Sequence, residues 1–481
     1  MNRSRTPGRP RTALKWFLDH ARSGADGEVV AEQVGPAIVV RPARYEEHLL
    51  REIAGALPAG PLSIVVAGGD APAGAVLDRL ARVVTEGARR GVREVRLVLL
   101  AGFPAVAPER WRALAERTRV TLLVPSGTVV PVGGTLFVRG PHGGLEGRWS
   151  RFAPGEPDHD SGPRHPAPRW QDTAAEDSFD VHGGLVVEHL PAGVLLRPAA
   201  TASARGWHAV PPDPHRFTVI AGVSGGARVL AEDVIAYLST LPLDVLKTAR
   251  LACGDGQDVV VLGRAVARGL DTAVTAIDGL PVVRRGKVEF MLHDPAGRPT
   301  WTPYLQEIRC LTGETAAVPL RWRPPHTGLV AQGPGLFLVR DGWVVGVMRS
   351  GLWLRRAGGA AQPVPVGAPV DPSVVTIAVG DLGEPLPDEV WPVLCDLLDR
   401  LEAPVLRRVR LSVLGLPSGQ GRAAVRELTR ARGIGAPLPV TGDQDPAEQD
   451  PGVGTPVDGT PVDGTVAVGT PAVEAVAHHE G

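Results

Sequence analysis

Residues 222–226 read Gly-Val-Ser-Gly-Gly and match G-x-S-x-G, the pattern that places a serine on a sharp turn between a strand and a helix. An apolar run at 216–221 precedes the motif and predicts a strand, and a helical pattern over about 227–239 follows it. In that context the Ser224 hydroxyl is exposed and neighbouring backbone N–H groups form an oxyanion hole. One hypothesis is therefore a serine hydrolase with Ser224 as its nucleophile.

A serine nucleophile also needs an imidazole to accept its proton and a carboxylate to orient that imidazole. The downstream residues with these chemistries are His293, His326, Asp278 and Asp294, and the candidate triad is Ser224, His293 and Asp278. The equivalent turns elsewhere in the chain read Gly68-Gly69-Asp70 and Gly380-Asp381-Leu382, without a serine. A turn that is rich in glycine for backbone reasons explains all three, so the sequence favours no catalytic residue.

The same turns suggest a second chemistry. A glycine-rich loop between a strand and a helix presents free N–H groups and the positive end of the helix dipole to an anion. The candidate anion-binding residues are Gly68, Gly69, Gly222, Gly225, Gly226 and Gly380. This hypothesis is a nucleotide- or phosphate-binding module. However, Asp70 and Asp381 would repel phosphate, so capping of the helices by these residues is the favoured interpretation.

A third group of residues has the chemistry of metal ligands, because imidazole and carboxylate both bind Zn or Mn. Its members are Asp158, His159, Asp160, His165 and His182. They fall within 153–183, a segment rich in Pro, Asp, Ser and Gly, which is typical of a solvated linker. We therefore expect no metal site and no cofactor.

Tryptophans cluster outside the predicted central strands. Trp301, Trp322, Trp343 and Trp353 either line a binding surface, where tryptophan and arginine are enriched, or pack one repeat against the next. The three cysteines have no neighbouring His or Lys pattern and are expected to be small buried apolar residues.

A repeated pattern must position these residues. Two apolar strand-like runs are followed by a further strand and an amphipathic helix in the ranges 28–84, 184–238 and 342–398, with offsets of about 155 residues. Strands that alternate with helices predict parallel βαβ pairing with right-handed crossovers. Hairpins are predicted at 127–140 and 279–292, whereas the third copy ends near Gly435 without one.

The predicted fold class is therefore α/β. We expect tandem small mixed α/β domains, two complete copies and one truncated copy, each with a parallel βαβαβ core and flanking β-hairpins. The predicted boundaries are a basic N-terminal tail at 1–27, repeat 1 with a Pro/Asp-rich linker at 28–183, repeat 2 at 184–334, truncated repeat 3 at 335–440 and a disordered acidic low-complexity tail at 441–481.

Length and charge restrict the function classes. The chain has 481 residues, with 51 Lys and Arg against 52 Asp and Glu, so no global charge favours nucleic acid or an anionic membrane. Three cysteines are too few for a disulfide framework and favour a reducing compartment. Because no export signal or run of about 18 apolar residues stands out, we expect a cytoplasmic location without membrane insertion, and export by a specialised route stays open.

The phrases PAGVLLRP, GWVVGVMRSGLWLRR and VPVGGTLF give the chain a resemblance to a known group. Over most of 28–435 the chain resembles repeat segments of very large, multidomain actinobacterial proteins of the polymorphic-toxin type. The resemblance implies a carrier or binding role and names no catalytic residue. It does not imply a toxin activity, since the C-terminus of this chain has no toxin signature.

These observations together predict a non-enzymatic repeat protein with a protein partner. Its role would be that of a scaffold, an adaptor or a secretion-associated module, because stacked repeats build long surfaces from local contacts. The serine hydrolase and the nucleotide- or phosphate-binding module remain the alternatives. The identity of the partner and the oligomeric state stay open.

Overall fold

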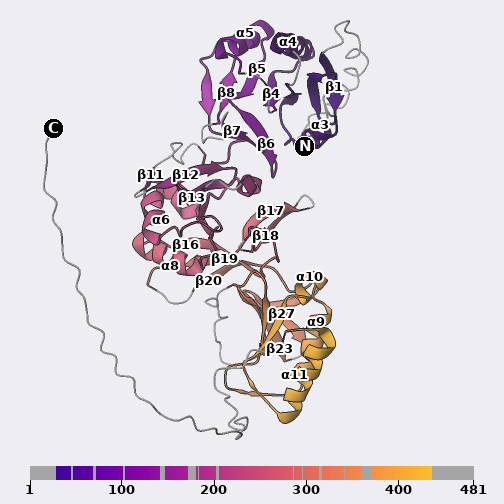
Figure 1. Ribbon diagram of the computed structural model, residues 1–481, viewed down its shortest axis with the longest axis vertical. Coiled ribbons are helices and arrows are strands. Elements are labelled where there is room, and N and C mark those ends of the chain that lie inside the picture. The colour runs from indigo at the N-terminus through magenta and orange to yellow at the C-terminus, as the bar shows by residue number, and fades with distance from the viewer. Residues whose placement is uncertain are drawn as a thin grey trace, which may run out of the picture. The chain divides into compact units, whose positions relative to one another are not determined.

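A computed structural model describes residues 29–435, apart from 45–46, 69–71, 101–102, 104, 141–146, 172–179, 182–183, 202–204, 285–286, 295, 314–316, 341 and 359–369 (Figure 1). The chain divides into two compact units, Met1–Leu438 and Pro439–Gly481. The second unit, most of which was predicted as an acidic tail, and the N-terminal tail at 1–27 lie outside the described residues.

The first sheet, called sheet 1 below, has seven strands. Their order is β1 (Val29–Val34), β2 (Ala37–Pro42), β3 (Leu62–Val66), β4 (Glu94–Leu99), β5 (Thr121–Pro125), β8 (Trp149–Phe152) and β9 (His159–Ser161). The four strands from β2 to β5 are parallel, and the flanking pairs are antiparallel. A smaller sheet has the order β10 (Arg164–His165), β7 (Thr135–Arg139) and β6 (Thr128–Val132).

The second sheet, sheet 2, repeats this order with one additional edge strand. Its strands are β11 (Asp180–Val181), β12 (Leu185–Leu190), β13 (Gly193–Pro198), β14 (Thr218–Ala221), β15 (Arg250–Cys253), β16 (Val274–Ile277), β19 (Leu305–Cys310) and β20 (Val318–Trp322). Strands β13 to β16 are parallel. The separate hairpin β17 (Leu280–Arg284) and β18 (Lys287–Met291) corresponds to β6 and β7, so both predicted hairpins form.

The third sheet, sheet 3, has six strands in the described part of the chain. These are β21 (Val330–Gly333), β22 (Leu336–Arg340), β23 (Trp343–Val347), β24 (Gly351–Arg356), β25 (Val375–Val379) and β27 (Val409–Val413). Strands β24, β25 and β27 are parallel, and β26 (Pro385–Leu386) pairs with β28 (Leu416–Pro417). The α/β class with parallel strands and flanking hairpins is confirmed, while the number of repeats and their boundaries stay predictions.

The helices cover the sheets with apolar faces. They are α3 (Glu47–Ala56), α4 (Ala73–Arg89), α5 (Pro108–Thr118), the 3-10 helix η1 (Arg205–Ala209), α6 (Ala231–Leu238), α7 (Leu243–Thr248), α8 (Val259–Gly269), α9 (Val390–Asp399), α10 (Ala403–Leu406) and α11 (Gly419–Arg432). In α4 the buried residues Val76, Leu80 and Val84 recur every four positions, which places them on the face that packs on sheet 1. Among the described residues, no helix is both long and apolar enough to span a bilayer.

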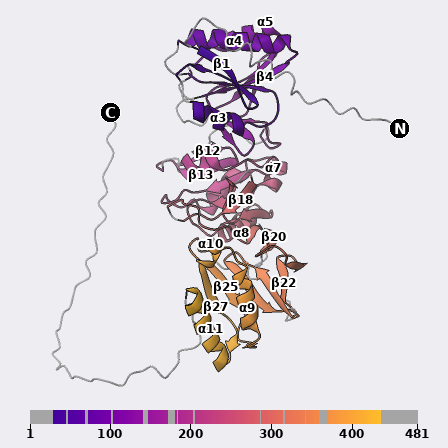
Figure 2. The ribbon, with the colours of Figure 1, turned by 90° about the vertical axis from the view of Figure 1, so that its right-hand side faces the viewer.

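The crossovers differ from the prediction in one respect. Helices α4 and α5 pack on one face of sheet 1, whereas α3 packs on the other through Leu50 and Ala54 (Figure 2). Because β2, β3, β4 and β5 are parallel and in sequential order, crossovers on opposite faces have opposite hands. The expectation of right-handed crossovers throughout is therefore wrong for sheet 1.

One cross-strand pair recurs in all three sheets. A serine or threonine on one parallel strand faces an arginine on the next parallel strand in the pairs Ser63–Arg96, Thr218–Arg250 and Thr376–Arg410. A second feature joins two of the sheets, since a single hydrophobic core contains side chains of both sheet 2 and sheet 3. The segments that form these two sheets are therefore packed together in the interior.

Candidate functional site

The Ser224 turn does not form a nucleophile elbow. Ser224 is exposed in a turn after β14, and α6 begins only at Ala231 instead of directly after the serine. The strand–serine–helix geometry that creates an oxyanion hole is therefore not built here. The other two members of the candidate triad have different contacts. Both carboxylate oxygens of Asp278 accept hydrogen bonds from Arg349, and His293 forms a β-bridge with Pro299.

Backbone geometry explains the glycine turns. Gly222 has φ +78°, and a Cβ atom there would lie 2.4 Å from Oδ2 of Asp255. Gly380 has φ +82°, and its carbonyl oxygen accepts a hydrogen bond from the indole of Trp353. The carboxylate of Asp255 against Gly222 disfavours an anion at this turn, and the phosphate-binding alternative stays an untested prediction. Of the other candidates, Gly68 is buried, Gly225 and Gly226 lie in the exposed turn, and Gly69 lies outside the described residues.

The tryptophan candidates belong mainly to the interior. Trp301, Trp343 and Trp353 are 2–5% exposed, and Trp322 is half-buried. The indole N–H of Trp301 donates to the carbonyl oxygen of Asp371 at 3.2 Å. The structure therefore places three of these four side chains in packing positions between elements and not on an open surface.

The segment predicted as a linker with possible metal ligands contains strands. Asp158 pairs with Arg112, Asp160 accepts a hydrogen bond from Ser150, and the ring of His165 packs on Trp149. Strands β9 and β10 lie in this segment, so its description as a solvated linker is incomplete. In the part of the chain that the structure describes, no group of three or more His, Cys, Asp or Glu side chains is arranged to hold a metal ion; His182 lies outside it.

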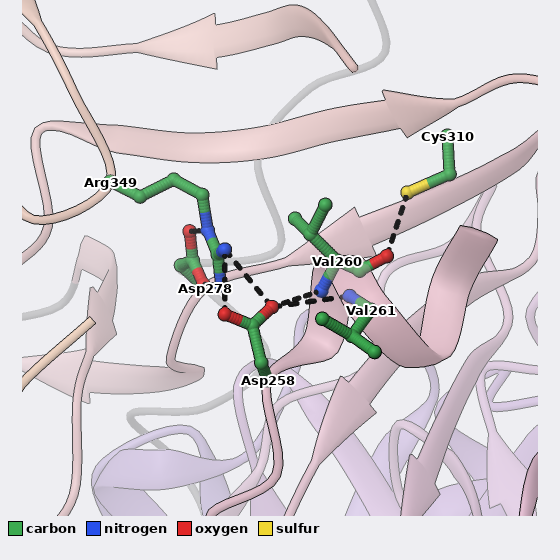
Figure 3. Close-up of polar contacts among 6 residues, drawn as sticks. All are labelled: Asp258, Val260, Val261, Asp278, Cys310 and Arg349. Atoms are coloured by element: carbon green, nitrogen blue, oxygen red, sulfur yellow. Dashed lines mark hydrogen bonds and ion pairs between the residues drawn. The ribbon is translucent and has the colours of Figure 1, made fainter. Parts of the chain in front are cut away.

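The most organised polar cluster involves Arg349, which the sequence did not single out. Its guanidinium donates from Nε to Asp278 Oδ2 at 2.7 Å and from Nη2 to Asp278 Oδ1 at 2.9 Å. Nη1 lies 3.0 Å from both oxygens of Asp258 (Figure 3). Arg349 is 1% exposed and Asp278 is 4% exposed. One buried guanidinium is therefore held by two carboxylates in a fork geometry.

Three elements position this cluster. Arg349 lies in the turn between β23 and β24 of sheet 3, while Asp278 directly follows β16 of sheet 2. Asp258 is the N-cap of α8 and accepts hydrogen bonds from the backbone N–H groups of Val260 and Val261 at 2.8 and 3.2 Å (Figure 3). The cluster thus connects a turn of sheet 3 to the carboxyl edge of the parallel strands in sheet 2.

The surroundings shift the protonation equilibria of the cluster. Burial raises the pKa of Asp278, and the hydrogen bonds from Arg349 oppose that rise. Burial also pushes the pKa of Asp258 upward, but the hydrogen bonds from Arg349 and from the two amides outweigh it and hold that pKa below its ordinary value. Burial alone would lower the pKa of Arg349, yet its two carboxylate partners raise it above the ordinary value. The cation therefore stays charged.

The neighbouring thiols, one buried and one half-buried, are poorly suited to nucleophilic chemistry. Burial raises the pKa of Cys310 to about 11, and burial followed by the nearby carboxylates of Asp255, Asp258 and Asp278 raises the pKa of Cys253. The Cys310 thiol contacts the carbonyl oxygen of Val260 (Figure 3). All three cysteines are free thiols; Cys310 is buried as expected, whereas Cys253 and Cys395 are half-buried.

Comparisons with known proteins give matches only among solved structures. No family model matches the chain, and no curated protein matches it. Among solved structures, a mutant amidase from Nesterenkonia sp. AN1 has a TM-score of 0.14 at 13% identity, covering 53% of this chain and 88% of that chain. The C. elegans NitFhit protein has a TM-score of 0.14 at 10% identity, covering 58% and 76%. Another mutant of the Nesterenkonia AN1 amidase, described as from the nitrilase superfamily, has a TM-score of 0.11 at 14% identity, covering 55% and 89%.

These matches correct the functional prediction. The expected non-enzymatic scaffold, adaptor or secretion-associated module is contradicted, since the matched chains include amidases. TM-scores of 0.11 to 0.14 transfer no catalytic residue, substrate or activity to this chain. The function must therefore be argued from the Arg349 cluster itself.

Proposed function

We propose that Asp258, Asp278 and Arg349 form an intramolecular lock that fixes the β23–β24 turn to the carboxyl edge of sheet 2. The observation that carries this proposal is the set of four contacts of 2.7–3.0 Å between the buried guanidinium and the two carboxylates. Each charged group has its opposite charge within the chain. The lock is thus complete without a ligand.

The position of the lock supports a structural role. In α/β sheets, ligands bind at the carboxyl ends of the parallel strands, where loops leave a crevice. Here Arg349 occupies the space after β15 and β16, and its partners Asp258 and Asp278 are the residues that would otherwise face a ligand. A catalytic carboxylate must be free to contact substrate, whereas both oxygens of Asp278 are engaged by Arg349.

Other contacts make the same connection. The indole of Trp301, after β18, donates to the carbonyl oxygen of Asp371, before β25. Side chains of the two sheets also share one hydrophobic core. Burial of apolar side chains already holds sheet 2 and sheet 3 together. The lock is expected to fix their relative orientation, a role that is known for some buried ionic groups.

Hydrogen exchange tests this function directly. Replacing Arg349 by Met keeps the apolar stem but leaves two carboxylates without their cation, and removal of one partner from a buried pair costs about 3–5 kcal/mol. Exchange of amides in β23, β24 and the first turn of α8 is expected to accelerate by roughly 100-fold or more. Arg432→Met is the matched control, because Arg432 pairs with the exposed Asp399 at a partly exposed position. Equal exchange in both variants would contradict the lock.

A further inference from the structure

Arg96 on β4 is a buried cation whose hydrogen-bond partners are neutral. Its Nε and Nη2 donate to the hydroxyl of Ser63 at 3.2 and 2.7 Å, and Nη2 also donates to the carbonyl oxygen of Pro58 at 2.8 Å. The side chain is 1% exposed, and its Nη1 is buried without an acceptor among the described residues. Burial lowers the pKa of Arg96 and the charge of Glu94 opposes this shift, although Glu94 forms no hydrogen bond with the guanidinium among the described contacts; a guanidinium keeps its proton in proteins. A buried charge of this kind needs compensation.

Sheet 2 shows how the same pair is compensated. Arg250 faces Thr218 in the register in which Arg96 faces Ser63. The Nη1 of Arg250 lies 3.3 Å from Asp213 Oδ2 and 3.5 Å from Glu307 Oε1. In sheet 2, therefore, two carboxylates of the chain surround the recurring arginine.

In sheet 1 the position of the first of these carboxylates is occupied by a proline. Asp213 stands five residues before Thr218, and the residue five positions before Ser63 is Pro58. Proline offers only its carbonyl oxygen, which Arg96 already uses. A neutral dipole thus replaces a negative charge at this position.

The second carboxylate is also replaced. In sheet 2 the arginine faces Thr275, and two residues further along β16 Ile277 faces Glu307. In sheet 1 the arginine Arg96 faces Leu123 on β5. Two residues further along β5 is Pro125, which faces Trp149 on β8. Trp149 is 0% exposed, and its indole N–H is a second buried donor without an acceptor in the described chain. A donor stands where sheet 2 has an acceptor.

We propose that Arg96 binds a small monovalent anion of the size of chloride, which takes the place of the two carboxylates present in sheet 2. The free Nη1 of Arg96 is the primary donor. A Cβ atom on Gly60 would lie 3.8 Å from this nitrogen, so the exposed Gly60 is a residue without a side chain close to the buried donor. A single charge suffices, because no second cation pairs with the site among the described residues.

Thermal unfolding of the full chain in sodium chloride and in sodium gluconate at equal ionic strength tests this site. Gluconate is too large to replace chloride beside a buried nitrogen. The Tm of the wild-type transition that exposes Trp149 is expected to be roughly 2–4 °C higher in chloride. Equal Tm values in the two salts would overturn the proposal and indicate that water alone satisfies Nη1.

Two variants and a control assign the effect to Arg96. Arg96→Met is expected to abolish the chloride dependence. Pro58→Asp restores the carboxylate of sheet 2, so its Tm in gluconate should match or exceed the wild-type value in chloride, with no further rise on adding chloride. Arg250→Met disturbs the equivalent pair of sheet 2, where the chain supplies the acids, and should keep the chloride shift of sheet 1. A chloride shift that persists in both Arg96→Met and Pro58→Asp would refute the assignment.

Discussion

The strongest quantitative prediction concerns the pair formed by Asp278 and Arg349. Replacing Asp278 by Leu leaves a buried guanidinium that keeps only Asp258, and replacing Arg349 by Met leaves a fully buried carboxylate without its cation. The double variant removes both charges and puts apolar groups of similar size in their place. The two single variants and the double variant define a thermodynamic cycle.

The burial of the pair sets the magnitudes. Arg349 is 1% exposed and Asp278 is 4% exposed, so each single variant is expected to lose about 3–5 kcal/mol of unfolding free energy. The double variant should lose less than either single variant, because no unpaired charge at Asp278 or Arg349 remains in the interior. The coupling energy should then be several kcal/mol, above the range of about 0.5–3 kcal/mol found for most contacting residues.

Denaturant unfolding monitored by tryptophan fluorescence measures these values, with the slope m compared between variants to detect a change in cooperativity. Asp258→Asn serves as a control, because Asn is an equally good N-cap and the Asp258 side chain is 20% exposed; its cost should stay near 1–2 kcal/mol. Losses in the double variant that equal the sum of the two single losses would refute the reasoning that charge burial dominates this site.

Three further predictions follow from local geometry. Burial and the charge of Arg96 lower the pKa of His165 to about 4. Between about pH 6.5 and pH 4 the folded protein therefore keeps this residue neutral, while the unfolded chain binds a proton there. The free energy of unfolding should fall by at most about 3 kcal/mol over this pH range. Unfolding of His165→Gln between these pH values should show a shallower slope, and an unchanged slope would contradict the shift. Gly222→Ala should lower the free energy of unfolding by about 2–4 kcal/mol, because Asp255 blocks the added methyl group. Gly225→Ala, at φ +76° and without a near contact, should lower it by only about 1–2 kcal/mol, and thermal unfolding measures both. Iodoacetamide should label Cys310 no faster than the protein opens, since burial raises the pKa of this thiol to about 11; labelling at the rate of a free thiol at pH 8 would disprove it.

The class of the fold and the succession of strands and helices along the chain could be read from sequence because they depend on local periodicity. Apolar runs such as those of β3 and β14 are buried on both faces, and the helices that follow them repeat their apolar residues every three or four positions. Each of these signals lies within one element or its neighbours. The difference in hand between the crossovers of sheet 1 was missed because it depends on which face of the sheet binds α3, and this is decided by Leu50 and Ala54 packing on distant strands.

The site was not predictable in the same way. Asp278 was selected as a possible triad member, but its partner lies 71 residues away on another sheet. A signal existed in the sequence, since Arg349 interrupts two apolar runs, and a charge in such a context predicts a buried counter-charge. The identity of that counter-charge is a tertiary property. The Ser224 motif failed for the opposite reason, because its local pattern was correct while the helix start at Ala231 depends on how the following residues pack.

Buried arginines form hydrogen bonds at two hairpin turns of this chain, but one turn accepts these bonds and the other donates them. Arg164, which is 2% exposed on β10, donates to the carbonyl oxygens of Pro191 and Gly193 at 2.8 and 3.0 Å, so the β12–β13 turn of sheet 2 accepts hydrogen bonds. The corresponding β23–β24 turn of sheet 3 instead supplies the cation, Arg349, to carboxylates of sheet 2. Carbonyl acceptors are present in any sequence, but carboxylates are not. Substitutions around Pro191 that keep the turn should therefore be tolerated, whereas the Arg349 contact depends on three side-chain identities at once, which makes it the more specific of the two connections.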